Sequence, residues 1–387
     1  MITDPTAVFA LMALCVAVAL VLEARVRVFA ALGSALVAIL LGMVLSNSGL
    51  VPGTSPAYDF LAGPAVSAGI VLILLTVDIR SVAKAGPRML AAFTIGGIGS
   101  ALGASAAALL LADSIGEETW KLAGQYAATY TGGGVNFAAV GAALETSGDL
   151  FAAGIAADVT MTAIWMMACL AVPVVFDAWG GSDRAVEPPK PDASSEEDAD
   201  VDATLYESLY SSIHALRLHD LGVLSVIVLA TLWASETLGA FFAPLPAVLF
   251  LTTIALLCAQ VPAIRQLRGA GVIGNYLVLI FLASNGAMSV LANILVIGLP
   301  VMYFAVLTVG VHGLVIFVVG RLAGLDLKTL AVASQANVGG PASAMALATA
   351  RGYTDRLLPG VAVGLLGYAA GNYLGFAVAN LLQGILA

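Results

Sequence analysis

The chain has 387 residues, of which 60% are hydrophobic and 10% charged, and its mean hydropathy of +1.02 excludes a water-soluble globular domain. The formal net charge is −9, but eight acidic residues fall within residues 181–202, so the apolar remainder is close to neutral. That distribution leaves no basic patch of the kind that nucleic acid binding requires. The composition therefore predicts a polytopic integral membrane protein with the lipid bilayer, and not nucleic acid, as its partner.

Apolar stretches of about 20 residues, the length needed to cross about 30 Å of hydrocarbon as a helix, recur almost from end to end. The first stretch lacks a basic leading segment and a small-residue cleavage site, which predicts a helix that is retained. In the first half the apolar segments lie near residues 7–23, 28–47, 59–79, 88–112, 118–147 and 150–177.

Residues 180–203 are rich in Pro, Ser, Asp and Glu, which predicts a disordered linker. Residues 204–217 are expected to form a short surface helix. The predicted units are a first membrane repeat at 1–178, an acidic cytoplasmic linker at 179–217 and a second, inverted membrane repeat at 218–387. In the second half the apolar segments lie near residues 219–240, 245–261, 271–292, 299–320, 328–350 and 357–385.

The two halves resemble each other in sequence. Residues 70–75 match residues 277–282 at an offset of 207. At an offset of 206, Gly133, Gly134, Asp149 and Gly154 match Gly339, Gly340, Asp355 and Gly360. Internal repeats of this size are typical of secondary transporters, whose two halves build a binding site at their interface. The repeat is the strongest functional signal in the sequence.

Basic residues predict the orientation through the positive-inside rule. Arg25 and Arg27 place the N-terminus outside, but if every segment crossed, the loop with Arg265 and Arg268 would lie on the wrong face. The conflict disappears if the fifth segment of each half, which glycines break at its centre, enters and leaves the membrane on one face. Two re-entrant hairpins are therefore favoured, with the linker in the cytoplasm.

The predicted fold is thus all-α, with two inverted repeats that each contain five transmembrane helices and one re-entrant hairpin. Crossing broken helices, which the same central glycines permit, are the alternative, and the count is about ten to twelve membrane segments. The expected location is the bacterial cytoplasmic (inner) membrane.

Breaks in membrane helices leave backbone groups that hydrocarbon cannot satisfy, so they mark sites where protein, water or a ligand supplies the partners. The N-terminus of a half-helix suits a carboxylate, and its carbonyl end suits Na⁺. Close helix packing by small residues is the alternative reading of the glycines. The predicted substrate-binding residues are Thr131, Gly132, Gly133, Gly134, Asn136, Asn337, Gly339, Gly340 and Ser343.

Asp158 lies in the middle of an apolar span, where a lone carboxylate is costly and marks a functional site by default. It is predicted to be a cation ligand or proton carrier, and the alternative is a structural partner for a nearby Ser, Thr or amide. His312 could titrate near neutral pH, although a lone His in a helix more often bonds a neighbouring carbonyl. The further ion-binding or proton-carrying candidates are Ser334, Gln335, Asn285, Asn372 and His312.

Two stretches carry a resemblance to a known family: TYTGGGVNFAAVGAA followed by AADVTMTAIW, and SQANVGGPASAMALATARG followed by PGVAVGLLGYAAGNYLGF. They resemble a YjcL-like family of uncharacterised bacterial membrane proteins over most of the chain. That family is grouped with the cation:proton antiporter and anion transporter superfamily, which includes bile-acid:sodium and glutamate:sodium symporters.

The resemblance implies an elevator-like carrier with a mobile core and a scaffold, and it implies no particular substrate. By position, the two glycine tips with Asn136 and Asn337 look like the paired core motifs of the superfamily. Sodium:proton antiporters of the superfamily typically carry adjacent acidic residues in the core, whereas Ala157 precedes Asp158 here. That departure weakens the hypothesis of a cation:proton antiporter.

The leading hypothesis is Na⁺-coupled or H⁺-coupled symport of a small organic anion, a carboxylate, between the tips. The alternatives are a monovalent cation:proton antiporter and, from another class, a non-transporting membrane sensor or scaffold. The sequence holds no nucleophile–base or His-Glu-x-x-His motif and no cofactor motif, and its three cysteines stand apart, so it is predicted not to be an enzyme. A homodimer through the first two helices of each half is expected.

Overall fold

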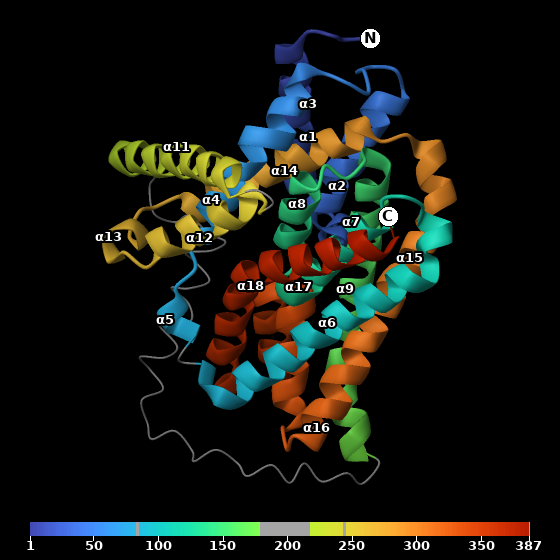
Figure 1. Cartoon of the computed structure of the whole chain (residues 1–387), viewed down its shortest axis with the longest axis vertical. Helices are drawn as coiled ribbons and strands as arrows, with labels where there is room; N and C mark the ends of the chain where they lie inside the picture. Colours follow the sequence, from blue (N-terminus) through green and yellow to red (C-terminus); the bar gives the residue numbers. More distant parts are fainter. Residues whose placement is uncertain (83–84, 179–216, 243–244, 387) are drawn as a thin grey trace.

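The computed structural model describes the chain except residues 83–84, 179–216, 243–244 and 387 (Figure 1). Every regular element of the described residues is helical. The predicted linker and surface helix lie, but for Arg217, outside the described residues. In the first half the helices are α1 (Pro5–Arg25), α2 (Arg27–Asn47), α3 (Pro56–Phe60), α4 (Val66–Leu74), α5 (Ile79–Val82), α6 (Gly86–Ile115), α7 (Thr119–Gly132), α8 (Gly134–Ala143) and α9 (Gly148–Ala178).

A π-helical turn at Leu61–Ala65 joins α3 to α4, and another at Val315–Val319 joins α15 to α16. In the second half the helices are α11 (Leu218–Phe241), α12 (Ala247–Ala259), α13 (Pro262–Arg265), α14 (Ala270–Met288), α15 (Leu291–Leu314), α16 (Gly320–Leu322), α17 (Leu327–Arg351) and α18 (Thr354–Leu386).

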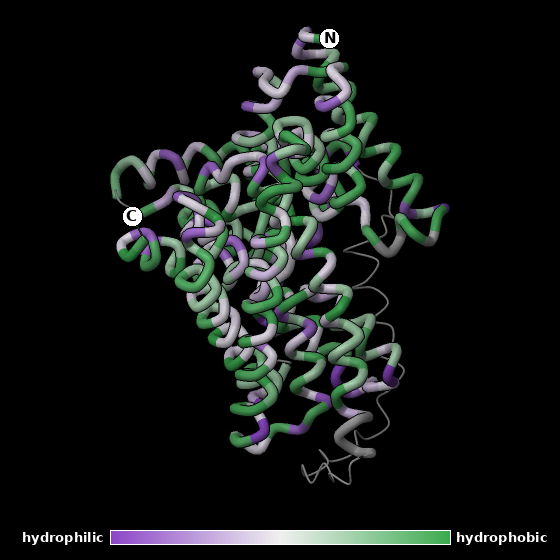
Figure 2. Tube along the Cα trace, turned by 90° about the vertical axis from the view of Figure 1, so that its right-hand side faces the viewer, coloured by the Kyte–Doolittle hydropathy of each residue, from purple (hydrophilic) through white to green (hydrophobic). Residues whose placement is uncertain are grey.

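Eight helices of the described residues are long and apolar enough to cross a membrane. The helix at Leu32–Asn47 and α12 are apolar but shorter, and α7, α8 and α17 make the two broken segments. Figure 2 shows hydrophobic residues along most of the trace. The prediction of an all-α polytopic membrane protein is confirmed.

The helices form two bundles. Helices α1 to α4, α11, α12 and α14 pack together, and so do α6 to α9 and α15 to α18; in Figure 1 the first bundle is the upper one. We name them the upper bundle and the lower bundle. Glycines let backbones touch inside each bundle: a Cβ on Gly42 of α2 would lie 2.0 Å from the Ala283 carbonyl oxygen of α14, and one on Gly103 of α6 would lie 2.4 Å from the Thr308 carbonyl oxygen of α15.

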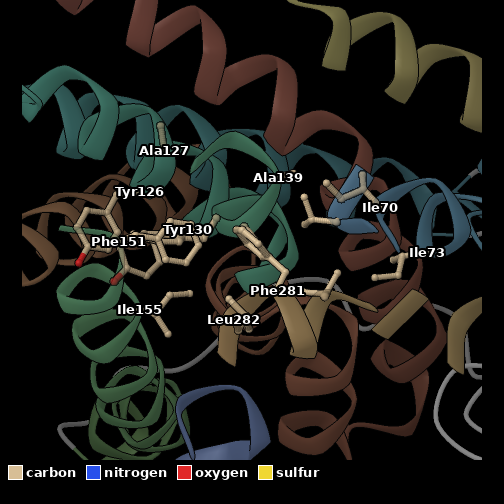
Figure 3. Packing of buried hydrophobic residues seen from close by; sticks show 14 of the residues in the cluster. Ile70, Ile73, Tyr126, Ala127, Tyr130, Ala139, Phe151, Ile155, Phe281 and Leu282 are labelled. Atoms are coloured by element: carbon tan, nitrogen blue, oxygen red, sulfur yellow. The ribbon is translucent and has the colours of Figure 1, made fainter. Parts of the chain in front are cut away.

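Aromatic side chains connect the two bundles. Tyr126 and Tyr130 of α7 stack at 5.3 Å between ring centroids, and Phe137 of α8 meets Phe151 of α9 edge-on at 5.2 Å. Phe151 in turn meets Phe281 of α14, in the upper bundle, at 5.5 Å, as Figure 3 shows from close by. These contacts bury large apolar rings where the two bundles meet.

Helices α7 and α8 form a hairpin, named hairpin 1, whose two ends lie together. The Glu118 carboxylate pairs with the Lys121 ammonium at 2.7 Å and accepts from the backbone N–H of Ser147 at 3.2 Å. Lys121 also donates to the Glu145 carbonyl at 3.0 Å. The chain reverses at Gly133, whose φ of 92° strongly favours glycine.

Helix α17 is broken at Gly340, with φ 76° and ψ −168°, and forms hairpin 2. A straight helix of its 25 residues would hold its ends about 37 Å apart. Instead, Asp326 at the start accepts from Arg356, just past the end, at 3.1 Å, and the Lys328 ammonium lies 5.6 Å from the Tyr353 ring centroid. Both fifth segments therefore have the hairpin geometry and not the crossing one.

The two hairpins approach from opposite ends of α9. The Ser147–Gly148 end of α9 adjoins the base of hairpin 1, whereas the Leu170 carbonyl, about 33 Å further along a helix, accepts from Arg351 at the base of hairpin 2. The tips touch, because a Cβ on Gly133 would lie 3.4 Å from Gly340. The inverted relation of the halves in a membrane and the elevator motion remain predictions.

Candidate functional site

Buried polar atoms without a hydrogen-bond partner gather where the hairpin tips meet. Such atoms are rare in folded proteins and often mark a place where a ligand, ion or water binds. Among the described residues these atoms are Tyr130 Oη, Asp158 Oδ1, both side-chain polar atoms of Gln335, Asn337 Oδ1, Arg351 Nε and Asn372 Oδ1. The first four residues belong to the hairpins or to α9 beside them.

Asp158 lies directly beside the tip of hairpin 1. Its side chain is only 5% exposed, and its Oδ2 accepts from the Thr129 hydroxyl at 3.4 Å. The same Oδ2 is 3.8 Å from the position of a Cβ on Gly134, so the carboxylate faces the N-terminus of α8. That end of a helix carries partial positive charge, which favours the ionised carboxylate there.

Within the part of the chain that the structure describes, no buried basic side chain neutralises this carboxylate. The buried charged residues of the described chain are Asp158, Asp220 and Asp326, with no Lys or Arg among them. An unpaired carboxylate in an apolar interior is costly. A proton or a bound cation would remove that cost at Asp158. No group of three or more His, Cys, Asp or Glu in the described residues could hold a multivalent metal ion.

Gln335 and Ser343 lie on the two arms of hairpin 2 and meet over Gly339. A Cβ on Gly339 would lie 2.4 Å from Ser343 Oγ and 2.8 Å from Gln335 Nε2, so only glycine leaves both side chains in place. Gln335 is fully buried, whereas Gly339 and Ser343 are partly exposed. The structure therefore brings these predicted site residues together at the tip.

Two predicted ligand side chains instead hold hairpin 1 in shape. Asn136 donates to the Gly367 carbonyl of α18 at 2.8 Å and to the Ala128 carbonyl at 3.4 Å. The Thr131 hydroxyl donates to the Ala127 carbonyl of its own helix at 2.7 Å. Both side chains are bonded to backbone carbonyls of α7 or α18, so the backbone N–H groups and Asp158 are the other groups at this tip that could bind a ligand.

His312 is held in a closed hydrogen-bond network. Its Nδ1 lies 2.9 Å from the Gly96 carbonyl, and its Nε2 lies 2.9 Å from Ser334 Oγ, which accepts from Trp165 Nε1 at 2.9 Å. Because the Gly96 carbonyl oxygen can only accept a hydrogen bond, Nδ1 carries the ring proton. Nε2 therefore accepts from the Ser334 hydroxyl. Ser100 bonds Nδ1 and the Tyr130 carbonyl. The bonds of His312 and Ser334 are therefore those of a structural brace behind the tips.

Three predicted amides donate to protein groups of their own or neighbouring helices. Asn285 donates to the Phe281 carbonyl of its own helix in the upper bundle at 3.2 Å. Asn372 donates at 3.2 Å to the Thr252 hydroxyl of α12 and so joins the two bundles. Asn337 donates to the Phe93 carbonyl of α6 at 3.3 Å, and its Oδ1 lies against Gly96.

Sequence reasoning missed Thr129 and Tyr130. Thr129 donates to Asp158, and the buried Tyr130 hydroxyl lies close enough to interact with the Asp158 carboxyl, although it forms no hydrogen bond of regular geometry. Both residues directly precede the predicted Thr131 and the glycine triplet. Their position next to the glycine triplet could have indicated them, because side chains of the last helical turn before a break lie around that break.

Residues 7–385 match the family described as proteins of unknown function, DUF819. The chain belongs to this family. Over 379 residues it is also 28% identical to the uncharacterized membrane protein YjcL of Bacillus subtilis (strain 168), covering 96% of this chain and 95% of that protein. This DUF819 chain is accordingly an integral membrane protein of many apolar helices, and the family resemblance expected from the two glycine-containing stretches is confirmed.

Proposed function

We propose that this DUF819 chain is a secondary transporter in which Asp158 takes up the coupling cation, Na⁺ or H⁺, and a small organic anion binds between the hairpin tips. The observation that carries the proposal is the buried Asp158 carboxylate, with Oδ1 unpartnered, at the point where two broken hairpins meet. A structural carboxylate would have its hydrogen bonds completed by protein groups.

The same geometry gives a physical reason for coupling. Asp158 lies at the N-terminus of α8, which is also the best place in the site for a substrate carboxylate. Two negative charges at one helix end repel each other, so the anion binds well only after a cation neutralises Asp158. Binding of the ion and of the anion is thereby linked, as symport requires.

The two bundles supply the parts for alternating access. Both hairpins belong to the lower bundle, which would move as a unit past the upper bundle. We place the N-terminus outside, the 179–217 linker in the cytoplasm, and the protein in the cytoplasmic (inner) membrane of a bacterium. A homodimer would form through α1, α2, α11 and α12 of the upper bundle, and crosslinking in membranes that yields only monomer would contradict it.

A monovalent cation:proton antiporter is the second candidate, because Asp158 alone could exchange a proton for a cation. A non-transporting sensor or scaffold would need neither the cation nor the anion. The three functions differ in which ligands stabilise the native state, since a bound ligand raises the midpoint of thermal unfolding.

The test measures that midpoint for the purified protein with a panel of organic acids, in Na⁺, K⁺ or choline, at two pH values. Symport predicts that one anion raises the midpoint only with the coupling cation or at the lower pH, and that Asp158→Asn abolishes the cation dependence. Asp220→Asn, at another buried carboxyl, is the matched control. If only cations and pH change the midpoint, the result indicates antiport. If no anion, cation or pH change alters it, the result contradicts both symport and antiport.

A further inference from the structure

One side of the second arm of hairpin 2 is accessible along its whole length. Gly339, at the tip before the break, and Ser343, Ala346, Thr349 and Ala350 of the second arm are partly or fully exposed. Between them, Ala342 and Met345 are partly exposed, and Ala344, Leu347 and Ala348 are buried. Ser343, Ala346 and Thr349 are three residues apart, and Ala350 follows Ala346 by four, so these four residues share one helical face. We name these five residues the small-residue stripe; it runs from the tip to the base of the hairpin.

The side chains of this stripe differ from those that face lipid elsewhere. On α11 the exposed side chains include Val226, Leu229 and Trp233, each more than 60% exposed at 67%, 66% and 71%. Large apolar side chains of this kind suit contact with hydrocarbon. The stripe contains only Gly, Ala, Ser and Thr, which leave room beside the helix and contribute two hydroxyl groups.

A second, independent feature lies at the inner end of the stripe. The Gln335 side chain is 0% exposed, yet neither its Oε1 nor its Nε2 has a hydrogen-bond partner. It meets Ser343, the first polar residue of the stripe, over Gly339. Leaving a buried amide unpartnered is costly, so a group that enters along the stripe would satisfy it.

We propose that the small-residue stripe lines the substrate route from the Asp326–Arg356 base of hairpin 2 to the tips, and that Gln335 and Ser343 form a specificity subsite at its inner end. The subsite rests on the proposed transport function. An amide presents both a donor and an acceptor. It fits a substrate whose carboxylate accepts from Nε2 while a neighbouring hydroxyl or ammonium group donates to Oε1, that is, a small hydroxy- or amino-carboxylate.

The route is tested by cysteine labelling, which needs no substrate. In a background with Cys15, Cys169 and Cys258 replaced by Ser, single Ala346→Cys and Thr349→Cys variants are exposed to a membrane-impermeant thiol reagent in sealed vesicles of either orientation. Ala323→Cys, in the loop before α17, and Ser114→Cys, at the end of α6, report the two faces. Ala230→Cys, among the exposed apolar residues of α11, is the lipid-facing control.

The expected result is that Ala346→Cys and Thr349→Cys react in the vesicle orientation in which Ala323→Cys reacts, and faster than Ala230→Cys. Reaction no faster than that of Ala230→Cys, or reaction only from the side of Ser114→Cys, would overturn the route. This result does not depend on whether the protein transports an organic anion, so it separates the route from the proposed function.

The subsite is tested with matched acids and the thermal midpoint. Malate and lactate should raise the midpoint more than succinate and propionate, which lack the hydroxyl group. Gln335→Met should abolish that difference while leaving the ligand-free midpoint equal or higher, because it removes an unpartnered amide. Equal or absent shifts within each pair would overturn the ligand class, and a lower ligand-free midpoint of Gln335→Met would show a structural amide and overturn the subsite.

Discussion

The two hairpins have nearly the same backbone and different chemistry. Gly133 has φ 92° and ψ 174°, and Gly340 has φ 76° and ψ −168°, so both chains reverse through the same glycine-favoured conformation. The helix after hairpin 1 brings Asp158 to the tip, but the offset of 206 that matches the two halves puts Gly364 at the equivalent place after hairpin 2. The first hairpin therefore has a carboxyl group beside its tip, whereas the second has a glycine at the matching position.

The hairpin bases also differ. Hairpin 1 is closed by Glu118 and Lys121, whose side chains are 28% and 17% exposed, and hairpin 2 by Asp326 and Arg356, at 6% and 16%. The second pair is more buried and is reinforced by Thr329, whose hydroxyl bonds Asp326 at 2.7 Å and Arg356 Nε at 3.2 Å. Hairpin 1 therefore has the charged group of the site beside it on α9, while hairpin 2 is closed by the more buried ion pair and itself contains the polar amide of Gln335.

The largest expected effect comes from filling the space behind the tip of hairpin 1. A Cβ in Gly132→Ala would lie 2.1 Å from the Gly367 carbonyl oxygen and 2.4 Å from Asn136 Nδ2. Because backbone atoms cannot yield easily, we expect a loss of stability of about 4 kcal/mol, measured by thermal unfolding in detergent. Gly384→Ala, with no atom within 4 Å of its Cβ, is the control. Equal midpoints for the two variants would show that the tip is not packed as described.

Removal of the ion pair at the base of hairpin 2 is next in size. Arg356→Gln leaves Asp326 half-satisfied in a largely buried place, so we expect a loss of about 2 kcal/mol, somewhat less than for a fully buried pair. Protease cleavage near residues 326–356 should become faster as the base opens. An unchanged unfolding midpoint would mean that the hairpin is closed by its apolar packing alone.

Low pH should weaken the ion pairs that close the two hairpins. Burial by itself would raise the pKa of the Asp326 carboxyl, but bonds from Thr329 and the Arg356 charge outweigh it and lower the pKa below its ordinary value of 3.8. The Glu118 carboxyl behaves in the same way, with its pKa lowered by Lys121 and Ser147 against the effect of burial.

A carboxyl group with a lowered native-state pKa contributes stability that is complete above its unfolded-state pKa and is lost as pH falls through the native-state value. The thermal midpoint should therefore fall below about pH 4, and Asp326→Asn should flatten part of that fall while lowering the midpoint at neutral pH. If the midpoint of Asp326→Asn falls as steeply with pH as that of the native chain, the Asp326 carboxyl group is not a source of the acid sensitivity.

The smallest effect is expected at the base of hairpin 1. Lys121→Gln removes a partly exposed ion pair, so the expected loss is about 0.5 kcal/mol, to be compared with Arg356→Gln in the same thermal assay. A loss of stability as large as that of Arg356→Gln would show that the ion pairs at the two hairpin bases contribute equally.

The hairpins and their meeting point could be predicted because glycine at a break has a strict backbone reason, and because basic loops constrain which face each end occupies. Asp158 could be predicted because burying a lone charge in an apolar span is so costly that it is rarely kept without a function. Both signals are local to the sequence. The packing of the tips against each other follows once both hairpins are placed at opposite ends of α9.

Other residues could not be placed in this way. A mid-span amide such as Asn285 or Asn372 shows polarity but not which neighbour faces it, and these two bond their own helix and the other bundle. His312 is likewise satisfied by partners from distant segments of the chain. Tyr130 was missed because an aromatic residue in an apolar segment is indistinguishable from core packing until its hydroxyl group is located.

The most direct test of the central claim uses the protein reconstituted into sealed lipid vesicles, with a radiolabelled acid taken from the thermal panel. With an inward gradient of the coupling cation, the native chain should accumulate the acid above its external concentration, and collapsing the gradient should release the excess. Asp158→Asn should show no gradient-driven accumulation, whereas Asp220→Asn should behave as the native chain. Undiminished accumulation by Asp158→Asn would contradict the assignment of the coupling cation to the carboxyl group between the hairpin tips.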